Sequence, residues 1–257
     1  MLITTLTVAW NAVATIADTC RSVAAQRHPA VEHLVIDGAS RDNTVGVARA
    51  HLRAGGRIVS EPDRGLYDAM NKGLAQATGE IVGFLNADDV FADDLVLSRI
   101  ASTFADPMVD AVFGDLVYVA ANDLTRVVRY WDAGSFRPRA FRYGIMPPHP
   151  TLYVRHSLLP RIGGFRLDLS MANDFECCLR WLSTHRLRVR HIPQVLVCMR
   201  LGGESNRSWR NVFRQNACIQ QALRWNNMAP HPLFPVLKIL IKGRQYVTAW
   251  KIRGRHK

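Results

Sequence analysis

Short apolar runs alternate with stretches of helical periodicity through the first hundred residues. The apolar runs lie at residues 2–9, 33–36, 57–60 and 81–85. Between the last two, Leu66, Met70 and Leu74 recur at the spacing of one helix face, and Gly79 follows as a stop signal. The run 81–85 is apolar throughout, as in a strand that is buried on both faces. This alternation predicts an α/β domain with a mostly parallel sheet flanked by helices.

Polar side chains follow two of the predicted strands at their carboxyl ends. Asp37 and Ser40 follow the second run, and Asn86, Asp88 and Asp89 follow the fourth. Ligands of parallel sheets bind beyond the carboxyl ends of the strands. Adjacent carboxylates can meet a divalent cation and a neighbouring hydroxyl at once, and Mg²⁺ and Mn²⁺ favour such oxygen ligands. Asp88 and Asp89 therefore predict a metal site, for which a polar turn leading into a helix is the alternative.

Several further motifs complete an ordered series along the chain. The series is Thr7–Asn11, Ile36–Asp42, Glu61–Gly73, Gly79–Glu80, Asn86–Asp89, Pro148–Thr151, Gly163–Phe165, Asn173–Glu176 and Met199–Ser205. In this order the motifs resemble glycosyltransferase family 2, the inverting enzymes of GT-A fold, and most of all the members that build bacterial exopolysaccharides and cell-surface glycolipids. The resemblance covers about residues 3–205. It implies a GT-A domain over 1–205, with a Rossmann-like nucleotide-sugar half over about 1–115 and an acceptor half over 116–205.

The resemblance also implies roles for single residues. The residues implied to bind the nucleotide are Ala9, Trp10, Asn11, Asp37 and Asp88, with Asp37 beside the base and Asp88 near the ribose. Asp89 would reach the metal and the diphosphate, with Mn²⁺ or Mg²⁺ as the cofactor. Asp174 matches the catalytic base of the family, and His149 falls near the diphosphate and the acceptor.

The sequence departs from the family pattern at two positions. Many members carry a second acid directly after the residue that matches Asp37, whereas Gly38 stands here. Gly38 therefore has no side chain to make the second expected contact to the nucleobase. Two positions before Asp88, Asn86 replaces a frequent Asp and removes a possible acidic contact.

The chemistry of inverting transfer agrees with these roles. One carboxylate must take the proton from the acceptor hydroxyl, which is general-base catalysis worth roughly 10²–10⁴-fold. A metal ion can stabilise the charge of the leaving nucleoside diphosphate. The alternative for Asp174 is a helix N-cap, and the two roles are compatible because the helix dipole favours an ionised carboxylate. Glu176 is expected to pair with Arg180 at i+4, and His149 could instead cap the backbone of its proline-rich loop.

Charge is distributed unevenly along the chain. The 33 Lys and Arg outnumber the 21 Asp and Glu, for a formal charge of +12, and a basic protein suggests a nucleic-acid partner. Residues 206–257, however, hold 11 basic residues and no acid, so residues 1–205 carry only +1. This distribution argues against nucleic-acid binding by the body of the protein and assigns the basicity to a C-terminal extension over 206–257.

The basic extension is expected to be helical. Residues 209–225 predict one helix, and a second apolar stripe begins at Val236 and is interleaved with Lys238 and Lys242. Such a stripe suits a helix on an anionic membrane surface, and packing on the catalytic domain is the alternative.

An odd count of five cysteines supports neither a disulfide framework nor a zinc site. We therefore expect a cytoplasmic protein that lies peripherally on the inner face of the plasma membrane.

The sequence as a whole predicts a metal-dependent, inverting glycosyltransferase. The expected donor is a UDP- or GDP-sugar, and the expected acceptor is a saccharide or a polyprenyl or other lipid-linked molecule in bacterial surface polysaccharide or glycolipid synthesis. One alternative is a sugar-phosphate nucleotidyltransferase, which needs a Gly-rich basic loop after the first strand, where Ala9–Ala12 lacks one. A non-catalytic membrane scaffold with this fold, or a nucleic-acid binder, is the alternative from a different class.

Overall fold

The computed structural model describes residues 1–134, 136–202 and 209–234. The strands are β1 (Ile3–Ala9), β2 (Val31–Asp37), β3 (Arg57–Ser60), β4 (Ile81–Phe84), β5 (Val90–Phe91), β6 (Ala111–Ala120), β7 (Asp123–Trp131), β8 (Tyr153–Arg155) and β9 (Val189–Arg200). The helices are α1 (Ile16–Ala24), α2 (Thr44–His51), α3 (Leu66–Gln76), α4 (Val96–Phe104), α5 (Leu159–Ile162), α6 (Asn173–Leu179) and α7 (Trp209–Trp225). Shorter turns of helix are η1 (Pro138–Tyr143), η2 (His149–Thr151), η3 (His156–Leu158) and η4 (Arg180–Thr184), of which η4 is a π-helix that continues α6.

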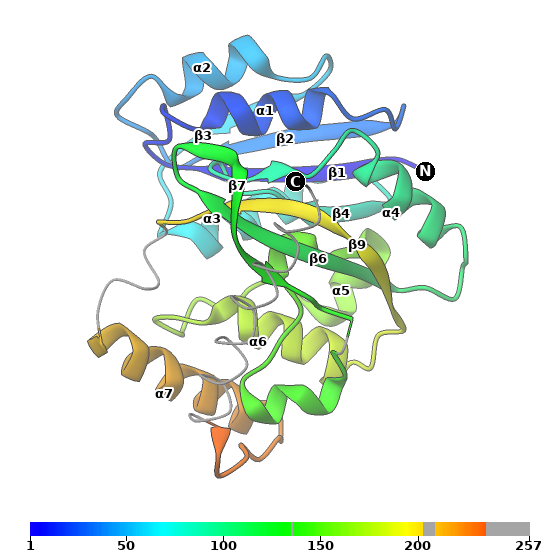
Figure 1. The fold of residues 1–257 in the computed structure, drawn as a ribbon, viewed down its shortest axis with the longest axis vertical. Coiled ribbons are helices and arrows are strands. Elements are labelled where there is room, and N and C mark those ends of the chain that lie inside the picture. Colours follow the sequence, from blue (N-terminus) through cyan, green and yellow to red (C-terminus); the bar gives the residue numbers. More distant parts are fainter. Residues whose placement is uncertain (135, 203–208, 235–257) are drawn as a thin grey trace.

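One sheet runs through the molecule (Figure 1), with the strand order β3-β2-β1-β4-β8-β6-β9-β5 and with β7 paired to β6. The four strands β1 to β4 are parallel, which confirms the mostly parallel sheet predicted for the first hundred residues. Strand β8 then pairs antiparallel with β4 and β6, so the sheet is mixed beyond β4. Because β1, β2 and β4 run in the same direction, their carboxyl ends meet at one edge of the sheet.

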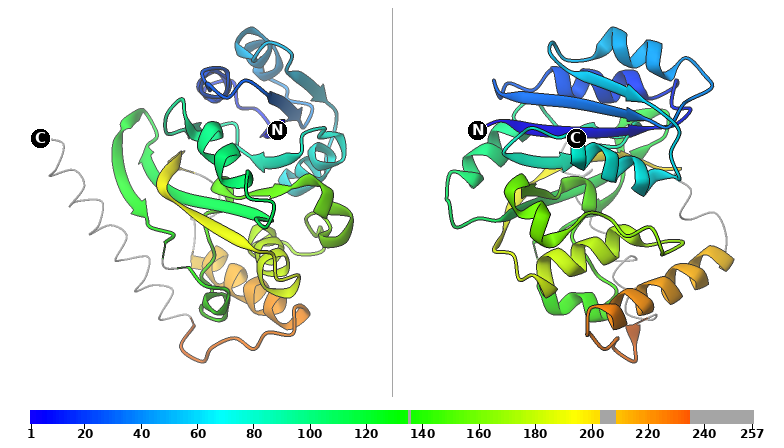
Figure 2. Two further views of the ribbon diagram at one scale, coloured as in Figure 1. Left: turned by 90° about the vertical axis from the view of Figure 1, so that its right-hand side faces the viewer. Right: turned by 180° about the vertical axis from the view of Figure 1, so that it is seen from behind.

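Helices cover both faces of the parallel strands, as Figures 1 and 2 show, with α1 and α2 on one side and α3 on the other. Alternate residues of β2 reach the two layers, because successive side chains of a strand point to opposite faces. Val35 packs in one buried cluster with Ile16 of α1, whereas Leu34 packs in another with Met70 and Leu74 of α3. This burial on both faces explains the continuous apolar run in β2.

Helix α7 matches the helix predicted over residues 209–225 and packs on α6. Ile219, Ala222 and Leu223 of α7 are buried in the same apolar cluster as Leu179 of α6. On another side of α7, Phe213 is 73% exposed. The amphipathic stretch predicted from Val236 lies outside the described residues. No helix in the described ranges has the length and apolar character that a membrane crossing requires.

Gly83 gives β4 and β8 their close packing. Gly83 pairs with Tyr153 across the two strands, and Tyr153 is completely buried. A Cβ atom at position 83 would lie 2.4 Å from Cδ1 of the Tyr153 ring. Only a glycine therefore fits beneath the ring at this point of the sheet.

His33 is a completely buried titratable group in the centre of β2. Its Nε2 atom lies 3.0 Å from Oγ1 of Thr7 on β1. Burial, with a smaller contribution from the charge of Arg53, lowers the pKa of His33 from 6.5 to about 3. The native state therefore binds fewer protons than the unfolded state between these two values. It follows that the contribution of His33 to stability is complete above pH 6.5 and is lost as the pH falls towards 3.

We predict that His33→Gln reduces the acid sensitivity of the fold, because glutamine can bond the Thr7 hydroxyl and does not titrate. Each pH unit within this window corresponds to about 1.4 kcal/mol. Between pH 7 and pH 5 the free energy of unfolding should fall by about 2 kcal/mol more in the wild type than in the variant. Urea denaturation at the two pH values measures this difference. Equal losses for the two proteins would show that His33 does not set the acid sensitivity.

Candidate active site

The carboxyl ends of β1, β2 and β4 come together as the sequence predicts. Ala9 and Asp37 are paired in register, and the amide of Gly38 donates to the carbonyl of Ala9 at 2.9 Å. The loop after β4 follows the same edge, because the amide of Ala87 donates to the carbonyl of Val8 at 3.3 Å. The predicted nucleotide-binding residues and the acidic pair therefore lie at one edge of the sheet.

Asn11 joins the loops after β1 and β2. The backbone N–H of Asn11 donates to Oγ of Ser40 at 2.8 Å. The side-chain Oδ1 of Asn11 accepts from the backbone N–H of Arg41 at 2.9 Å. Asn11 adopts a left-handed backbone conformation with φ of 49°, which asparagine tolerates better than most residues. The neighbouring Trp10 is 67% exposed and is free to contact a ligand above this edge.

Asp37 is completely buried at the end of β2. Its Oδ2 accepts from the amide of Ser40 at 3.0 Å and from Oγ of Ser60 at 2.7 Å. Its Oδ1 accepts from the hydroxyl of Ser40. The carboxylate thus closes its own loop and links it to β3, so it lies beneath the surface that a nucleotide would meet.

The acidic loop after β4 contains one accessible and one buried carboxylate. Asp88 is half-buried, whereas Asp89 is 0% exposed. Oδ1 of Asp89 accepts from the amide of Arg200 at 3.3 Å, and Oδ2 of Asp89 and Oδ1 of Asn86 lack a hydrogen-bond donor among the described residues. Burial, reinforced by the charge of Asp88, raises the pKa of Asp89 well above its usual range. Burial also raises the pKa of Asp88.

Arg200, at the end of β9, fixes this loop in place. Its Nε donates to the carbonyl of Asp88 at 2.9 Å, its Nη1 donates to the carbonyl of Ala121 at 3.0 Å, and its Nη2 pairs with Asp18 of α1. We did not predict these roles of Arg200 and Asp18 from the sequence. They are contacts between distant segments that no local pattern encodes.

The oxygen atoms of the acidic loop suit a hard divalent cation. Within the described ranges, no cluster of three or more His, Cys, Asp or Glu side chains is placed to hold an ion. Asp88 and Asp89 nevertheless offer two carboxylates, and the unpartnered oxygens of Asp89 and Asn86 are acceptors of the kind that Mg²⁺ and Mn²⁺ prefer. Such ions commonly take their remaining ligands from phosphate and water, so the residues present fit a metal bound together with a diphosphate.

Asp174 lies in the first turn of α6. The N-cap of this helix is Ala172, which has a left-handed backbone with φ of 61°, so the alternative prediction that Asp174 is the N-cap is wrong. Oδ1 of Asp174 accepts from the amide of Phe175 at 2.8 Å, and the side chain is half-buried. A left-handed alanine costs energy, and such positions cluster at functional sites.

His149 and Tyr67 lie close to Asp174. The His149 ring is stacked on Phe84 at 5.4 Å and meets Phe165 edge-on at 5.4 Å. Burial lowers the pKa of His149, and the charge of Asp174 partly opposes this shift. Burial and the charge of Asp174 also raise the pKa of Tyr67 well above its usual range. Nε2 of His149 is buried and has no partner among the described residues. We did not predict the place of Tyr67 beside Asp174 from the sequence.

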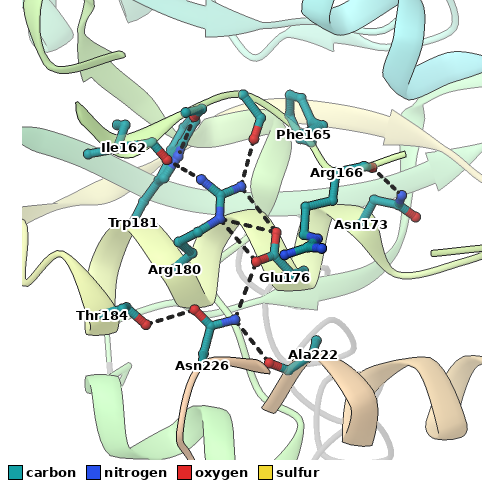
Figure 3. A network of polar contacts seen from close by, with 12 residues as sticks. Ile162, Phe165, Arg166, Asn173, Glu176, Arg180, Trp181, Thr184, Ala222 and Asn226 are labelled. Carbon is teal, nitrogen blue, oxygen red and sulfur yellow. Dashed lines mark hydrogen bonds and ion pairs between the residues drawn. The ribbon is translucent and has the colours of Figure 1, made fainter. Parts of the chain in front are cut away.

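The predicted pair between Glu176 and Arg180 is confirmed (Figure 3), with Nε of Arg180 at 3.0 Å from Oε1 of Glu176. Arg180 also donates to the carbonyl of Gly164 at 2.6 Å and to the carbonyl of Ile162. Nδ2 of Asn226, just beyond α7, donates to Oε1 of Glu176 at 3.3 Å. The network therefore fixes both the turn before Phe165 and the end of α7 to the helix that carries Asp174.

Comparisons with known proteins identify the family. The profile of glycosyl transferase family 2 matches residues 4–166, and the chain belongs to this family. An uncharacterized glycosyltransferase of Mycobacterium tuberculosis is 33% identical over 181 residues, which are 69% of this chain and 68% of that protein. A glycosyltransferase of Mycobacterium bovis named for PGL/p-HBAD biosynthesis is 30% identical over 190 residues, 72% of each chain.

A solved structure supports the same fold. The mannosyltransferase of Pyrobaculum calidifontis, determined in complex with GDP-Man and Mn²⁺, matches with a TM-score of 0.66 at 23% identity. The match covers 92% of this chain and 68% of that protein. The fold is therefore the GT-A fold, as the sequence predicts.

We predict that Asp89→Asn stabilises the protein in the absence of metal. The substitution removes a buried carboxylate that has no cationic partner at Oδ2, while Oδ1 still accepts from Arg200. The free energy of unfolding at pH 7 should rise by about 1–3 kcal/mol. The control is Asp132→Asn, an exposed substitution that keeps its hydrogen bond to Gly134. Urea denaturation with EDTA tests this, and an unchanged or lower stability of Asp89→Asn would contradict it.

Proposed function

We propose that this protein transfers a sugar from a UDP- or GDP-sugar to an acceptor hydroxyl with inversion at the anomeric carbon. The observation that carries the proposal is the acidic loop after β4. Its carboxylates lie at the carboxyl edge beside the ends of β1 and β2, and two buried oxygens of the loop, Oδ2 of Asp89 and Oδ1 of Asn86, have no donor among the described residues. A binding surface for a nucleoside diphosphate and its cation accounts for this arrangement.

Donor binding is assigned to the carboxyl edge of the sheet. Ala9, Trp10 and Asn11 would line the nucleotide pocket, Asp88 would contact the ribose, and Asp89, whose Oδ2 is left open by Arg200, would hold Mn²⁺ or Mg²⁺. When bound, the metal neutralises charge that develops on the leaving diphosphate. Arg200 holds the loop backbone through the carbonyl of Asp88, so the carboxylates are positioned before the donor arrives.

Asp174 is assigned as the general base. It lies in the first turn of α6, and its carboxylate is the group that would accept the proton of the acceptor hydroxyl. His149 stays neutral at neutral pH because burial lowers its pKa, and its unpartnered Nε2 is available to a hydroxyl or phosphate oxygen of the substrates. Glu176 is already paired with Arg180, so it does not compete for the acceptor proton.

The acceptor is assigned to the saccharides and lipid-linked molecules of bacterial surface polysaccharide or glycolipid synthesis. The similarity to the relative named for PGL/p-HBAD biosynthesis supports this class. The 11 basic residues of positions 206–257 would draw the protein to the anionic inner face of the plasma membrane, where a lipid-linked acceptor is found. The enzyme would then work in the cytoplasm as a peripheral membrane protein.

We predict that Asp174→Asn abolishes transfer and leaves donor binding intact, because the amide cannot accept the proton but keeps the shape of the side chain. The assay follows release of nucleoside diphosphate from UDP- and GDP-sugars with Mn²⁺. The wild type should release it, whereas a scaffold would not, and the rate of the variant should fall roughly 10²–10⁴-fold. Titration calorimetry with the active donor's nucleotide checks binding. Near-normal turnover of Asp174→Asn would exclude Asp174 as the base.

We also predict that Asp89→Asn abolishes the metal dependence of nucleotide binding. In the wild type, Mn²⁺ should strengthen the binding of UDP or GDP, since the cation joins the carboxylate to the diphosphate. Calorimetric titrations with Mn²⁺ and with EDTA should give the same Kd for Asp89→Asn and different values for the control Asp132→Asn. A normal Mn²⁺ effect in Asp89→Asn would remove Asp89 from the metal site.

A further inference from the structure

The space above Gly38 is filled by a carboxylate from another loop. A Cβ atom at Gly38 would lie 2.4 Å from Oδ2 and 3.2 Å from Cγ of Asp63. Asp63 follows β3, the strand that pairs with β2 and ends beside Asp37. An acid from the neighbouring strand end therefore stands where many relatives carry an acid directly after the residue that matches Asp37.

Among the described residues, only one oxygen of the Asp63 carboxylate is held by a hydrogen bond. Its Oδ1 accepts from the amide of Gly65 at 2.8 Å, in the turn that leads into α3. Gly65 has φ of 107°, a conformation that favours glycine, so the turn and its hydrogen bond are set by the sequence. No hydrogen bond between described residues uses Oδ2 of Asp63, and the side chain is half-buried. One oriented carboxylate oxygen is thus open at the carboxyl edge.

Asp37 lacks such an open oxygen. Both of its oxygens accept hydrogen bonds from Ser40 or Ser60, and the residue is 0% exposed. Contact between its carboxylate and a nucleobase would require these bonds to break. Of the two acids, Asp63 is therefore the better placed to read a base that lies over the Gly38 loop.

We propose that Asp63 is the residue that selects the nucleobase of the donor. The inference rests on the proposed function, which supplies the nucleotide. A carboxylate oxygen only accepts hydrogen bonds, so when it faces the ring nitrogen of the base edge it favours N3–H of uracil or N1–H of guanine. Cytosine and adenine present a lone pair at the corresponding ring nitrogen, and this lone pair would repel the carboxylate. Asp63 thus restricts the donor to uridine or guanosine nucleotides and rejects cytidine and adenosine nucleotides.

The test is a nucleotide-binding panel on the full-length protein. The Kd values of UDP, GDP, CDP and ADP are measured by calorimetry with Mn²⁺ for the wild type, Asp63→Asn, Gly38→Ala and the control Glu61→Gln. Glu61 lies in the same loop, is 48% exposed and pairs with Lys72, so its substitution removes the same charge. Gly38→Ala leaves Asp63 in the chain but places a methyl group where its Oδ2 lies.

The wild type should bind its preferred nucleotide, UDP or GDP, at least tenfold more tightly than CDP or ADP. A hydrogen bond to a charged group accounts for roughly 10–100-fold in affinity, so Asp63→Asn and Gly38→Ala should lose most of this preference. Glu61→Gln should keep it. Thermal denaturation of each variant establishes that it is folded.

Two outcomes would overturn the inference in distinguishable ways. If Asp63→Asn and Gly38→Ala discriminate among the four nucleotides as the wild type does, Asp63 does not read the base, and the proposed transferase activity still stands. If the folded wild type binds none of the nucleotides with Mn²⁺, the proposed function fails and the inference fails with it.

Discussion

The arrangement of the segments around α6 depends on one buried ion pair. Glu176 is 1% exposed and Arg180 is 16% exposed, and burial of this kind costs more desolvation energy than exposed pairs do. The cost is offset because Arg180 also donates hydrogen bonds to the carbonyls of Ile162 and Gly164, and Glu176 also accepts one from Asn226. Two segments distant in sequence, the turn at residues 162–164 and the end of α7, are therefore held to one helix. Removing either partner would leave an unpaired charge in the interior.

The parallel part of the sheet depends on a different constraint, the shared direction of β1, β2 and β4. That direction alone brings three strand ends to one edge. Hydrogen bonds accepted by Asn11 and Asp37 and donated by Arg200 then fix the loops that leave it. The rigid parts of the site are thus the backbones of the loops. Among the described residues, the buried polar atoms without a partner include Oδ2 of Asp89 and Nε2 of His149, which the proposed function would pair with a metal or a substrate.

Much of the fold could be predicted from the sequence, because apolar runs and helical periodicity are local signals. The predicted strand at residues 57–60 and the predicted helix at 209–225 match β3 and α7 to the residue. The site was predicted less fully. Asp174 is not the N-cap, since the left-handed Ala172 takes that position and nothing in the type of residue signals it. The clamp by Arg200 and the position of Asp63 over Gly38 depend on contacts between loops, which no spacing along the chain encodes.

The contact between Gly83 and Tyr153 has a consequence for the history of the family. A side chain larger than hydrogen at position 83 needs a smaller residue at position 153, because the two occupy the same space between β4 and β8. Relatives that change one position are expected to change the other. We therefore expect glycine at position 83 to accompany an aromatic residue at position 153, so that the two positions change together.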